Sequence, residues 1–364
     1  MTRKACTEVR VGVPLTGGRL VAAARERGYP VLFSANAFAR NYPKGHEREG
    51  SFKAFRLPDP LQFEGLDAAL DSAGYVAAVA HRDYRWSVED YFDLVAAHPW
   101  KWAASMDYCC EREIAGDRPM RLLRMAATAF MLGRCRAEAR GRGLQAPMPV
   151  LQGWTPDEYV TCAEWLPLTE WPELVGIGSV CRRQIDGSDG ILAILEAVDA
   201  ILPAHTRCHL FGVKSTVLEL IADHPRVASV DSMAWDVQAR VERRTGRDMD
   251  FRISHMEAWT TKQQRIASSA RPGATGVQTM LFDPAAFGGL NDHEALVLEG
   301  LALQYAELVM SGDIDYLDAV SQSMRDGVTV IAILRNQGLT PEALEAFDDI
   351  IAGFADRVRP WAEI

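Results

Sequence analysis

The sequence of 364 residues contains no long apolar run. No stretch approaches the roughly 18 consecutive apolar residues that a membrane-spanning helix requires. The most apolar segment, residues 191–202, is interrupted by Glu196 and Asp199, which is typical of an amphipathic helix. The first eight residues also lack the apolar centre of a secretory signal. With 48% apolar residues, the composition predicts a soluble, cytoplasmic globular protein with a large core.

Cysteines are few and irregularly spaced. There are seven of them, an odd number, which argues against a disulfide framework and favours a reducing compartment. The last is Cys208, and no pair has the spacing of zinc ligands with a histidine partner. Internal repeats and low-complexity segments are absent as well. We therefore expect neither a metal nor a cofactor.

The chain has no overall excess of positive charge. Its 39 Lys and Arg against 49 Asp and Glu give a formal net charge of −10. This balance argues against a protein that coats nucleic acid, yet it permits a local basic face, because the field that a polyanion meets is that of the patch.

Short apolar runs alternate with longer amphipathic segments. Helix start signals are present at 87–90 and 155–158, where a capping residue is followed three positions later by a carboxylate. The pattern predicts an α/β fold, a (β/α)8 barrel over residues 1–280, with residues 281–364 forming a helical extension. A doubly wound sheet competes, but no glycine fingerprint opens an early helix. The eight predicted strands are 9–15, 31–34, 66–70, 102–106, 148–151, 174–178, 208–213 and 227–230.

Chemically capable residues follow several of these strands, and in a β/α barrel all of them would surface at the face where active sites are built. Taken singly, each has a structural explanation. Asp231 after strand 227–230, for example, is also a common helix N-cap. Successive strand ends nevertheless carry Asp71, Asp107, Gln152, Gly178, Phe211 and Asp231.

In these residues the sequence resembles the tRNA-guanine transglycosylases that insert queuine and archaeosine bases. The family's Asp-Ser-Gly-Gly-aromatic motif is similar to 71–75, and its Phe-Asp-x-Cys motif is similar to 106–109. Its Gln-Gly, Gly-Gly, Leu-Met-Gly-Val and Asp-Ser motifs are similar, in the same order, to 152–153, 177–178, 210–213 and 231–232. The resemblance covers roughly residues 65–240.

The resemblance implies a base exchange on an intact sugar, by the chemistry of a retaining glycosidase. It makes Asp231 the nucleophile that attacks the anomeric carbon. Asp71 would be the general acid/base. Asp107 and Gln152 would read the edge of the guanine.

Four further residues would complete the base site. The backbone amides of Gly178 and Ser179 would contact the exocyclic or seven-position group of the purine. Tyr75 and Phe211 would stack on the two faces of the ring. Membership of the barrel core explains these two aromatics equally well.

Two departures separate the chain from the tRNA enzymes. The zinc subdomain that follows their nucleophile is missing, because no cysteine lies beyond Cys208, and Ala73 replaces the first glycine of the base motif. The sequence is closer to the branch that inserts 7-deazaguanines into DNA, to which helix 252–265 is also similar. We expect a DNA guanine transglycosylase that inserts 7-cyano-7-deazaguanine. A tRNA-guanine transglycosylase and a non-catalytic base-binding subunit are the alternatives.

A nucleic-acid substrate requires a phosphate-binding surface. Residues 236–271 hold eight Lys and Arg and five Asp and Glu, a local balance of +3 directly after the Asp231 strand. Within this segment we expect phosphate contacts from Arg240, Arg243, Arg244 and Arg247. A second cluster at 134–142 is explained equally well by a solvated helix face. The target nucleotide must be flipped or single-stranded, so a partner ATPase or helicase is plausible.

Overall fold

The structure of the chain is a computed structural model, and it describes residues 7–181, 183–185, 187–242 and 248–269. All of these fall within one compact unit. The predicted helical extension 281–364 lies outside the described residues, and so do Arg243, Arg244 and Arg247.

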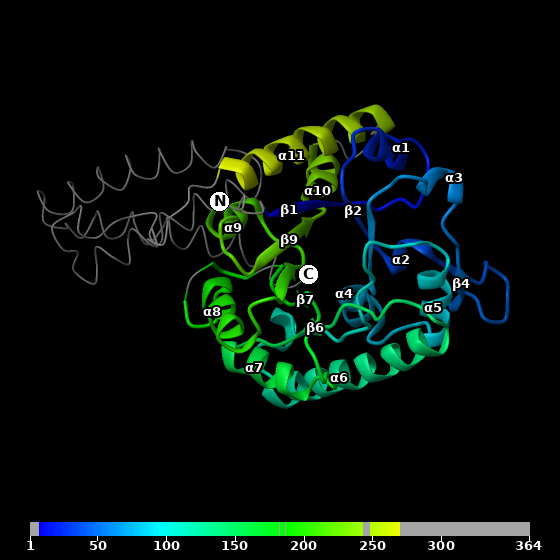
Figure 1. The fold of residues 1–364 in the computed structure, drawn as a ribbon. Helices are drawn as coiled ribbons and strands as arrows, with labels where there is room; N and C mark the ends of the chain where they lie inside the picture. Colours follow the sequence, from blue (N-terminus) through cyan, green and yellow to red (C-terminus); the bar gives the residue numbers. More distant parts are fainter. Residues whose placement is uncertain (1–6, 182, 186, 243–247, 270–364) are drawn as a thin grey trace, which may run out of the picture. The chain divides into compact units, whose positions relative to one another are not determined.

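A curled sheet of seven strands, all parallel, forms the centre of the fold (Figure 1). The strand order is β5-β2-β1-β9-β8-β7-β6, so neighbours follow the chain around the curl. The strands are β1 Glu8–Gly12, β2 Val31–Ser34, β5 Ala68–Asp71, β6 Val150–Leu151, β7 Leu174–Ile177, β8 Arg207–Leu210 and β9 Val227–Ser232. Each coincides with a predicted strand to within a few residues.

The prediction of a closed (β/α)8 barrel is wrong at one position. The run 102–106 forms no strand, and the edges β5 and β6 are joined only by two isolated bridges, Leu70 to Ala103 and Ala104 to Met148. Pro149, which precedes β6, has no N–H to extend this pairing. The fold is therefore a barrel-like, incompletely closed sheet. We call residues 102–105 the seam segment.

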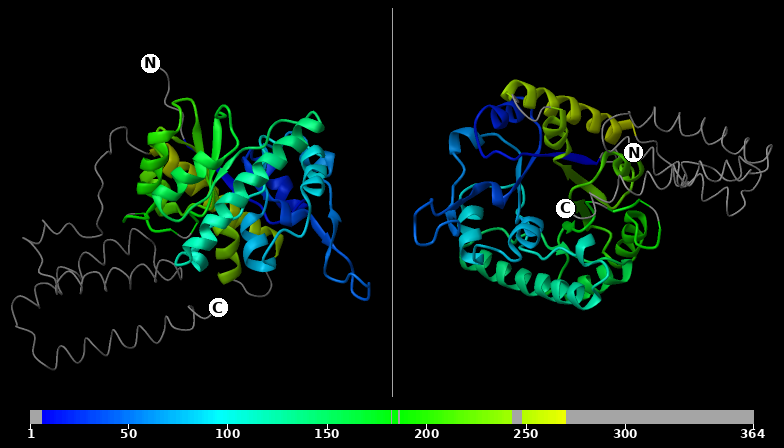
Figure 2. Two further views of the ribbon diagram at one scale, coloured as in Figure 1. Left: turned by 90° about the horizontal axis from the view of Figure 1, so that it is seen from below. Right: turned by 180° about the vertical axis from the view of Figure 1, so that it is seen from behind.

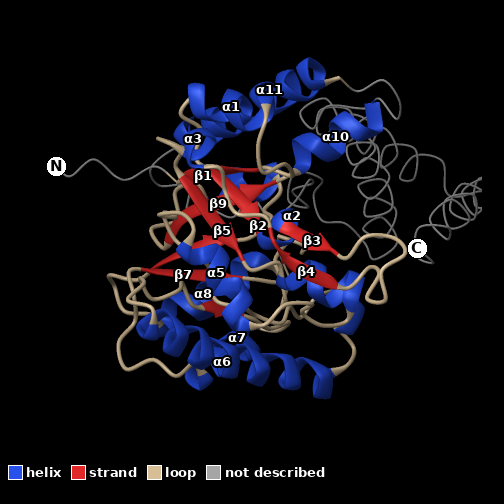
Figure 3. Ribbon diagram, turned by 90° about the vertical axis from the view of Figure 1, so that its right-hand side faces the viewer, coloured by secondary structure: helices blue, strands red, loops and turns tan. Residues whose placement is uncertain are grey.

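Helices cover the outside of the sheet (Figure 3). Both predicted start signals are confirmed, because Ser87 and Thr155 each form a capping box at the start of a helix. The longer helices are α1 Arg19–Glu26, α5 Val88–Ala96, α6 Arg118–Gly141, α7 Pro156–Trp165, α8 Ile191–Ile201, α9 Ser215–Ile221, α10 Ala234–Glu242 and α11 Met249–Ser269. The shorter ones are α2 Ala35–Phe38, α3 Pro60–Phe63 and α4 Gly74–Val76, with a π-helical turn at Ala77–His81 and a 3-10 turn at Arg112–Ile114.

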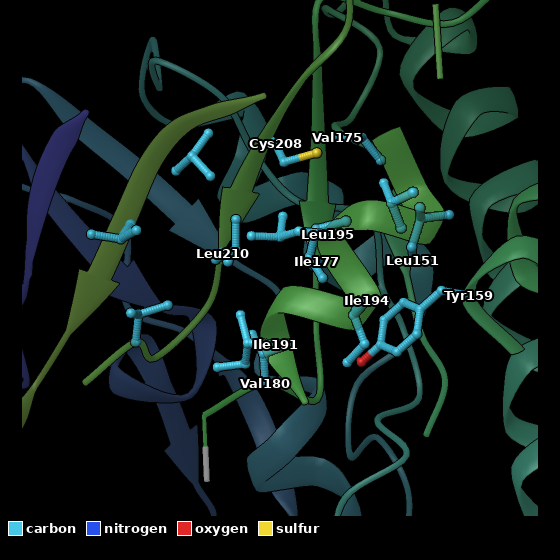
Figure 4. Close-up of a cluster of buried hydrophobic side chains, with 14 of the residues drawn as sticks. Leu151, Tyr159, Val175, Ile177, Val180, Ile191, Ile194, Leu195, Cys208 and Leu210 are labelled. Carbon is cyan, nitrogen blue, oxygen red and sulfur yellow. The ribbon is translucent and has the colours of Figure 1, made fainter. Parts of the chain in front are cut away.

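The main apolar core lies between the sheet and this helical layer. Figure 4 shows one part of it, where Ile194 and Leu195 of α8 pack against Ile177 of β7 and Leu210 of β8. All four side chains are at most 1% exposed. Burial of this kind, at about 25 cal/mol per Å² of apolar surface, is the main force that holds the strand ends in place.

Two further strands were not predicted. β3 Ala39–Asn41 and β4 Phe52–Phe55 pair antiparallel in a separate hairpin between β2 and β5. Figure 2 shows this hairpin extending outward from the barrel-like body.

In the described part of the chain, no helix is long and apolar enough to cross a membrane.

Candidate base-exchange site

Three aspartates from different parts of the chain form the centre of the candidate site. Asp71 ends β5, Asp107 follows the seam segment and Asp231 lies at the end of β9. Asp107, and to a smaller extent Asp231, raises the pKa of the Asp71 carboxyl through its negative charge. The Asp71 carboxyl is thus close enough to interact with both of the other aspartates.

Burial has the largest effect on Asp71. It raises the pKa of the carboxyl to about 8, although the Ala73 N–H donates to Oδ2 at 3.0 Å. Ala73 adopts φ 71°, the left-handed conformation that its glycine counterpart in the family motif adopts without strain. The Ala73 N–H bond lowers the pKa of Asp71, but burial and the charge of Asp107 outweigh it and favour the protonated carboxyl at neutral pH.

Asp107 is surrounded by donors. The Ser72 hydroxyl donates to Oδ1 at 2.9 Å, and the Gln152 amide group donates to Oδ2. Burial raises the pKa of Asp107 to about 6, and these two hydrogen bonds oppose that rise. At neutral pH a larger fraction of Asp107 than of Asp71 is therefore ionised.

A chain of hydrogen bonds fixes the orientation of Gln152. The Cys110 N–H donates to Ser179 Oγ at 2.7 Å, so the Ser179 hydroxyl hydrogen is free to go to Gln152 Oε1 at 2.5 Å. The Gln152 amide must then present its NH2 group to Asp107. This network gives the site one donor group and one acceptor group side by side.

Glycines allow these side chains to approach the backbone closely. A Cβ at Gly74 would lie 2.6 Å from the Asp107 carbonyl oxygen and 2.8 Å from Oδ1, and a Cβ at Gly178 would overlap the Gln152 amide. The Gly178 N–H itself donates to Leu151 O at 3.0 Å within the sheet. The Gln152 amide therefore occupies the space that a side chain at position 178 would fill.

Asp231 is held through one oxygen. The Gly212 N–H donates to Oδ1 at 3.0 Å, and His209 Nε2 lies 3.3 Å from the same atom. His209 Nδ1 is 2.7 Å from Ser229 Oγ, and burial lowers the pKa of the imidazole, which favours its neutral form. The Asp231 side chain is 13% exposed, whereas that of His209 is completely buried.

Rings from β8 and the seam segment fill the interior next to Asp231. The His209 ring lies 4.8 Å from Trp102 and 4.7 Å from Phe211. The Arg10 guanidinium lies 5.6 Å from the Trp102 ring and is paired with Glu8 and with Asp67. Phe211 thus belongs to this interior cluster, and Tyr75 is half-buried on α4.

Sequence reasoning missed several members of the site. Tyr84 OH donates to the Asp107 carbonyl at 2.9 Å and also lies 2.9 Å from Ser72 Oγ. Ser72 was noticed only as part of a motif, and nothing in the sequence marks Tyr84 or His209. Their roles depend on contacts across 12 to 23 residues or between strands, which no local pattern encodes.

The predicted phosphate-binding arginines are described only in part. Arg240 is half exposed and pairs with the buried Asp236 at 2.8 Å, and Arg252 pairs with the same carboxylate at 2.7 Å.

The described residues contain no group of three His, Cys, Asp or Glu that could hold a metal ion.

Comparison with known proteins agrees with the resemblance seen in the motifs. A search of curated proteins found no match. The family model of DpdA, DeoxyPurine in DNA protein A, matches residues 52–270, which is more than half of the chain and includes Asp71, Asp107 and Asp231. The chain therefore belongs to the DpdA family, a transglycosylase-like family of DNA-modification enzymes.

Proposed function

We propose that the protein exchanges guanine in DNA for a 7-deazaguanine base, such as 7-cyano-7-deazaguanine, through a covalent Asp231–sugar intermediate. Membership of the DpdA family implies a role in 7-deazaguanine DNA modification, with DNA as the substrate. The observation that carries the proposal is that the Asp71 carboxyl lies close enough to Asp107 and Asp231 for both charges to add to the effect of burial, which raises its pKa to about 8.

In the first half of the exchange, Asp231 attacks C1′ of the target nucleotide and the C1′–N9 bond breaks. Both contacts to the Asp231 carboxylate described above fall on Oδ1, so Oδ2 would be the attacking atom. The departing guanine takes up the proton of Asp71, which becomes a carboxylate. A raised pKa is what a general acid needs at neutral pH.

The second half reverses these steps with a different base. N9 of the incoming 7-deazaguanine attacks C1′, the C1′–O bond to Asp231 breaks, and the N9 proton passes to Asp71. Both residues return to their starting state, so one group serves as acid and then as base, as in retaining glycosidases.

Base recognition would use the Asp107–Gln152 pair. The carboxylate would accept from N1–H and the exocyclic amine of guanine, and the Gln152 NH2 group would donate to O6. Both carboxylate oxygens already accept hydrogen bonds, so Asp107 is held in its acceptor state before the base arrives. Ser179 would act by orienting Gln152. Phe211, in the interior cluster, and Tyr75, on α4, would border the ring.

The test follows radiolabelled guanine into polymer. We expect the wild-type protein to incorporate it into DNA that contains an unpaired guanine, and to release it when 7-cyano-7-deazaguanine is added. The Asp231→Asn variant should lose at least about 10³-fold in rate and form no denaturation-resistant protein–DNA adduct, since the nucleophile is gone.

A transfer RNA substrate and the Ser229→Ala variant serve as controls. Within the described residues, the hydrogen bond of the Ser229 hydroxyl goes to Nδ1 of His209, the ring nitrogen that does not face Asp231, so its loss should leave the adduct detectable. Exchange into transfer RNA but not into DNA would reassign the polymer. Full activity of Asp231→Asn would refute the nucleophile, and a wild type that binds guanine without exchange into either polymer would indicate a binding subunit.

A further inference from the structure

The β3–β4 hairpin arises next to the candidate site. The chain leaves β2 at Ser34, which pairs in register with Asp71, and passes through α2 directly into the hairpin. The hairpin therefore starts from the same end of the sheet as the proposed general acid, and it projects outward from there (Figure 2).

An aromatic cluster anchors the base of the hairpin. The Phe52 and Phe55 rings lie 5.7 and 5.1 Å from Trp86, and the Tyr84 ring lies 5.8 Å from the same indole. Tyr84 in turn bonds the backbone of Asp107. Two side chains thus link the hairpin to the residue that would read the base.

A polar clamp fixes the hairpin from the other side. The Arg85 guanidinium donates to Asn41 Oδ1 at 2.7 Å and to Asn36 Oδ1 at 3.1 Å. Asn41 ends β3, and Asn36 lies in α2. Together with the aromatic cluster, this clamp sets the direction in which the hairpin leaves the body.

The hairpin is basic and its charges face solvent. Residues 39–56, which we call the basic hairpin, hold five Lys and Arg and two Glu, five minus two or +3, in a chain of net −10. Tyr42 lies under the Arg48 guanidinium at 4.7 Å and 5.8 Å from the Lys53 ammonium. The five exposed cations are Arg40, Lys44, Arg48, Lys53 and Arg56.

These cations differ from the other arginine clusters of the protein. Within the described part of the chain, none of the five forms an ion pair. By contrast, Arg134 and Arg142 of the α6 region pair with carboxylates, and Arg240 shares Asp236 with Arg252. An unpaired cation attracts phosphate more strongly than one already neutralised by a neighbour.

We propose that the basic hairpin binds the phosphate backbone of the DNA strand beside the target nucleotide. The inference rests on the proposed function for the identity of the polymer. Exposed cations spread along one projecting element suit a DNA strand that leaves the duplex next to the site, because its phosphates can reach several of these charges at once. The anchoring through Trp86 and Tyr84 holds this contact at a fixed position relative to Asp107.

The test measures DNA binding separately from catalysis. A fluorescein-labelled duplex with a short unpaired bubble around one guanine is titrated with the full-length protein from 50 to 200 mM NaCl. The variant Arg40→Gln/Lys44→Gln/Lys53→Gln should bind at least about tenfold more weakly at 100 mM salt. The slope of log K against log salt should fall by about 2 to 3, since each lost phosphate contact removes nearly one unit.

The matched control removes the same charge elsewhere. Arg134→Gln/Arg136→Gln/Arg140→Gln on α6 should change affinity by less than about twofold. All substituted hairpin residues are exposed, and an unchanged melting temperature would verify that the variant is folded. Exchange assays over a range of DNA concentrations up to saturation should show a raised KM for DNA with kcat within about twofold.

Each outcome separates this inference from the proposed function. An unchanged affinity and salt slope in the hairpin variant would overturn the role of the hairpin, even if exchange is normal. Equal losses in the α6 control would overturn it as well, because total charge would then be the cause. A wild type that shows the hairpin effect on binding but no base exchange would leave the inference intact and refute the enzyme.

Discussion

At the scale of single residues, the environments of Asp71 and Asp107 give the two carboxyl groups different pKa values, with the higher value at Asp71. Burial dominates for both, but two side-chain donors reach Asp107, whereas Asp71 accepts backbone N–H groups and carries the repulsion of both other aspartates. Two neighbouring carboxyl groups thus hold different charges at neutral pH. That difference is what an acid and a base-reading acceptor require.

The pKa of Asp71 predicts how guanine release depends on pH. Asp71 must be protonated to donate, so the single-turnover rate of guanine release should fall as pH rises through about 8. In the Asp71→Asn variant the side chain has the same shape but has no acidic proton to donate. The rate of guanine release should fall by about 10²- to 10⁴-fold. The measurement is rapid-quench release of labelled guanine from pH 6 to 9.5. A rate that rises through pH 8 would contradict the role of Asp71 as acid.

Local sequence patterns found the residues at the strand ends but not the residues that orient them. Asp71, Gln152 and Asp231 stand out because a polar residue directly follows an apolar run. Tyr84 lies in an irregular loop, and its contact with Asp107 exists only after the chain has folded. His209 is inside a strand, where its position facing Asp231 depends on the register between β8 and β9.

At the scale of secondary-structure elements, the order of strands was predictable and the closure was not. Short apolar runs between helices identify β-strands regardless of their partners, so seven of the eight predicted strands were confirmed. Whether the eighth run forms a ladder depends on its neighbours, and the prolines before β6 limit it to isolated bridges. The hairpin was missed because its strands are short and surrounded by polar residues.

The end of β7 provides a test of close packing. Gly178→Ala places a methyl group where the Gln152 amide lies, so Gln152 must leave Asp107. We expect a KM for guanine at least about tenfold higher, measured by exchange of labelled base. In the control Gly133→Ala within α6, the new methyl meets only Pro167 Cγ at 3.7 Å, and stability should rise by about 0.5–1 kcal/mol. A normal KM in Gly178→Ala would contradict the proposed role of Gln152.

At the scale of the whole molecule, the buried carboxyls couple stability to pH. The folded-state pKa values of about 8 and about 6 both lie above the ordinary value of 3.8, so between pH 4 and 8 the native state binds more protons than the unfolded state. Their contribution to stability is fully present at low pH and is lost as pH rises. The raised pKa that the proposed acid Asp71 requires therefore lowers the stability of the folded protein at neutral pH.

We therefore expect the free energy of unfolding to decrease from pH 5 to pH 8, by at most about 1.4 kcal/mol per pH unit for each such carboxyl. Urea unfolding of the wild type and of Asp71→Asn at both pH values measures the contribution of Asp71. The variant should show the smaller decrease, because its side chain cannot ionise. Equal decreases in the two proteins would mean that Asp71 ionises as easily in the folded state as in the unfolded chain.

The seam segment has a consequence for how the molecule responds to its substrate. The four residues 102–105 bond Leu70 on one edge and Met148 on the other, and Asp107 follows them by two positions. If Asp107 binds the purine as proposed, the base is linked through only two residues to the backbone that connects the two sheet edges. Coupling free energies are reciprocal. If binding of the base stabilises the contact between β5 and β6, then that contact strengthens the binding of the base by the same free energy.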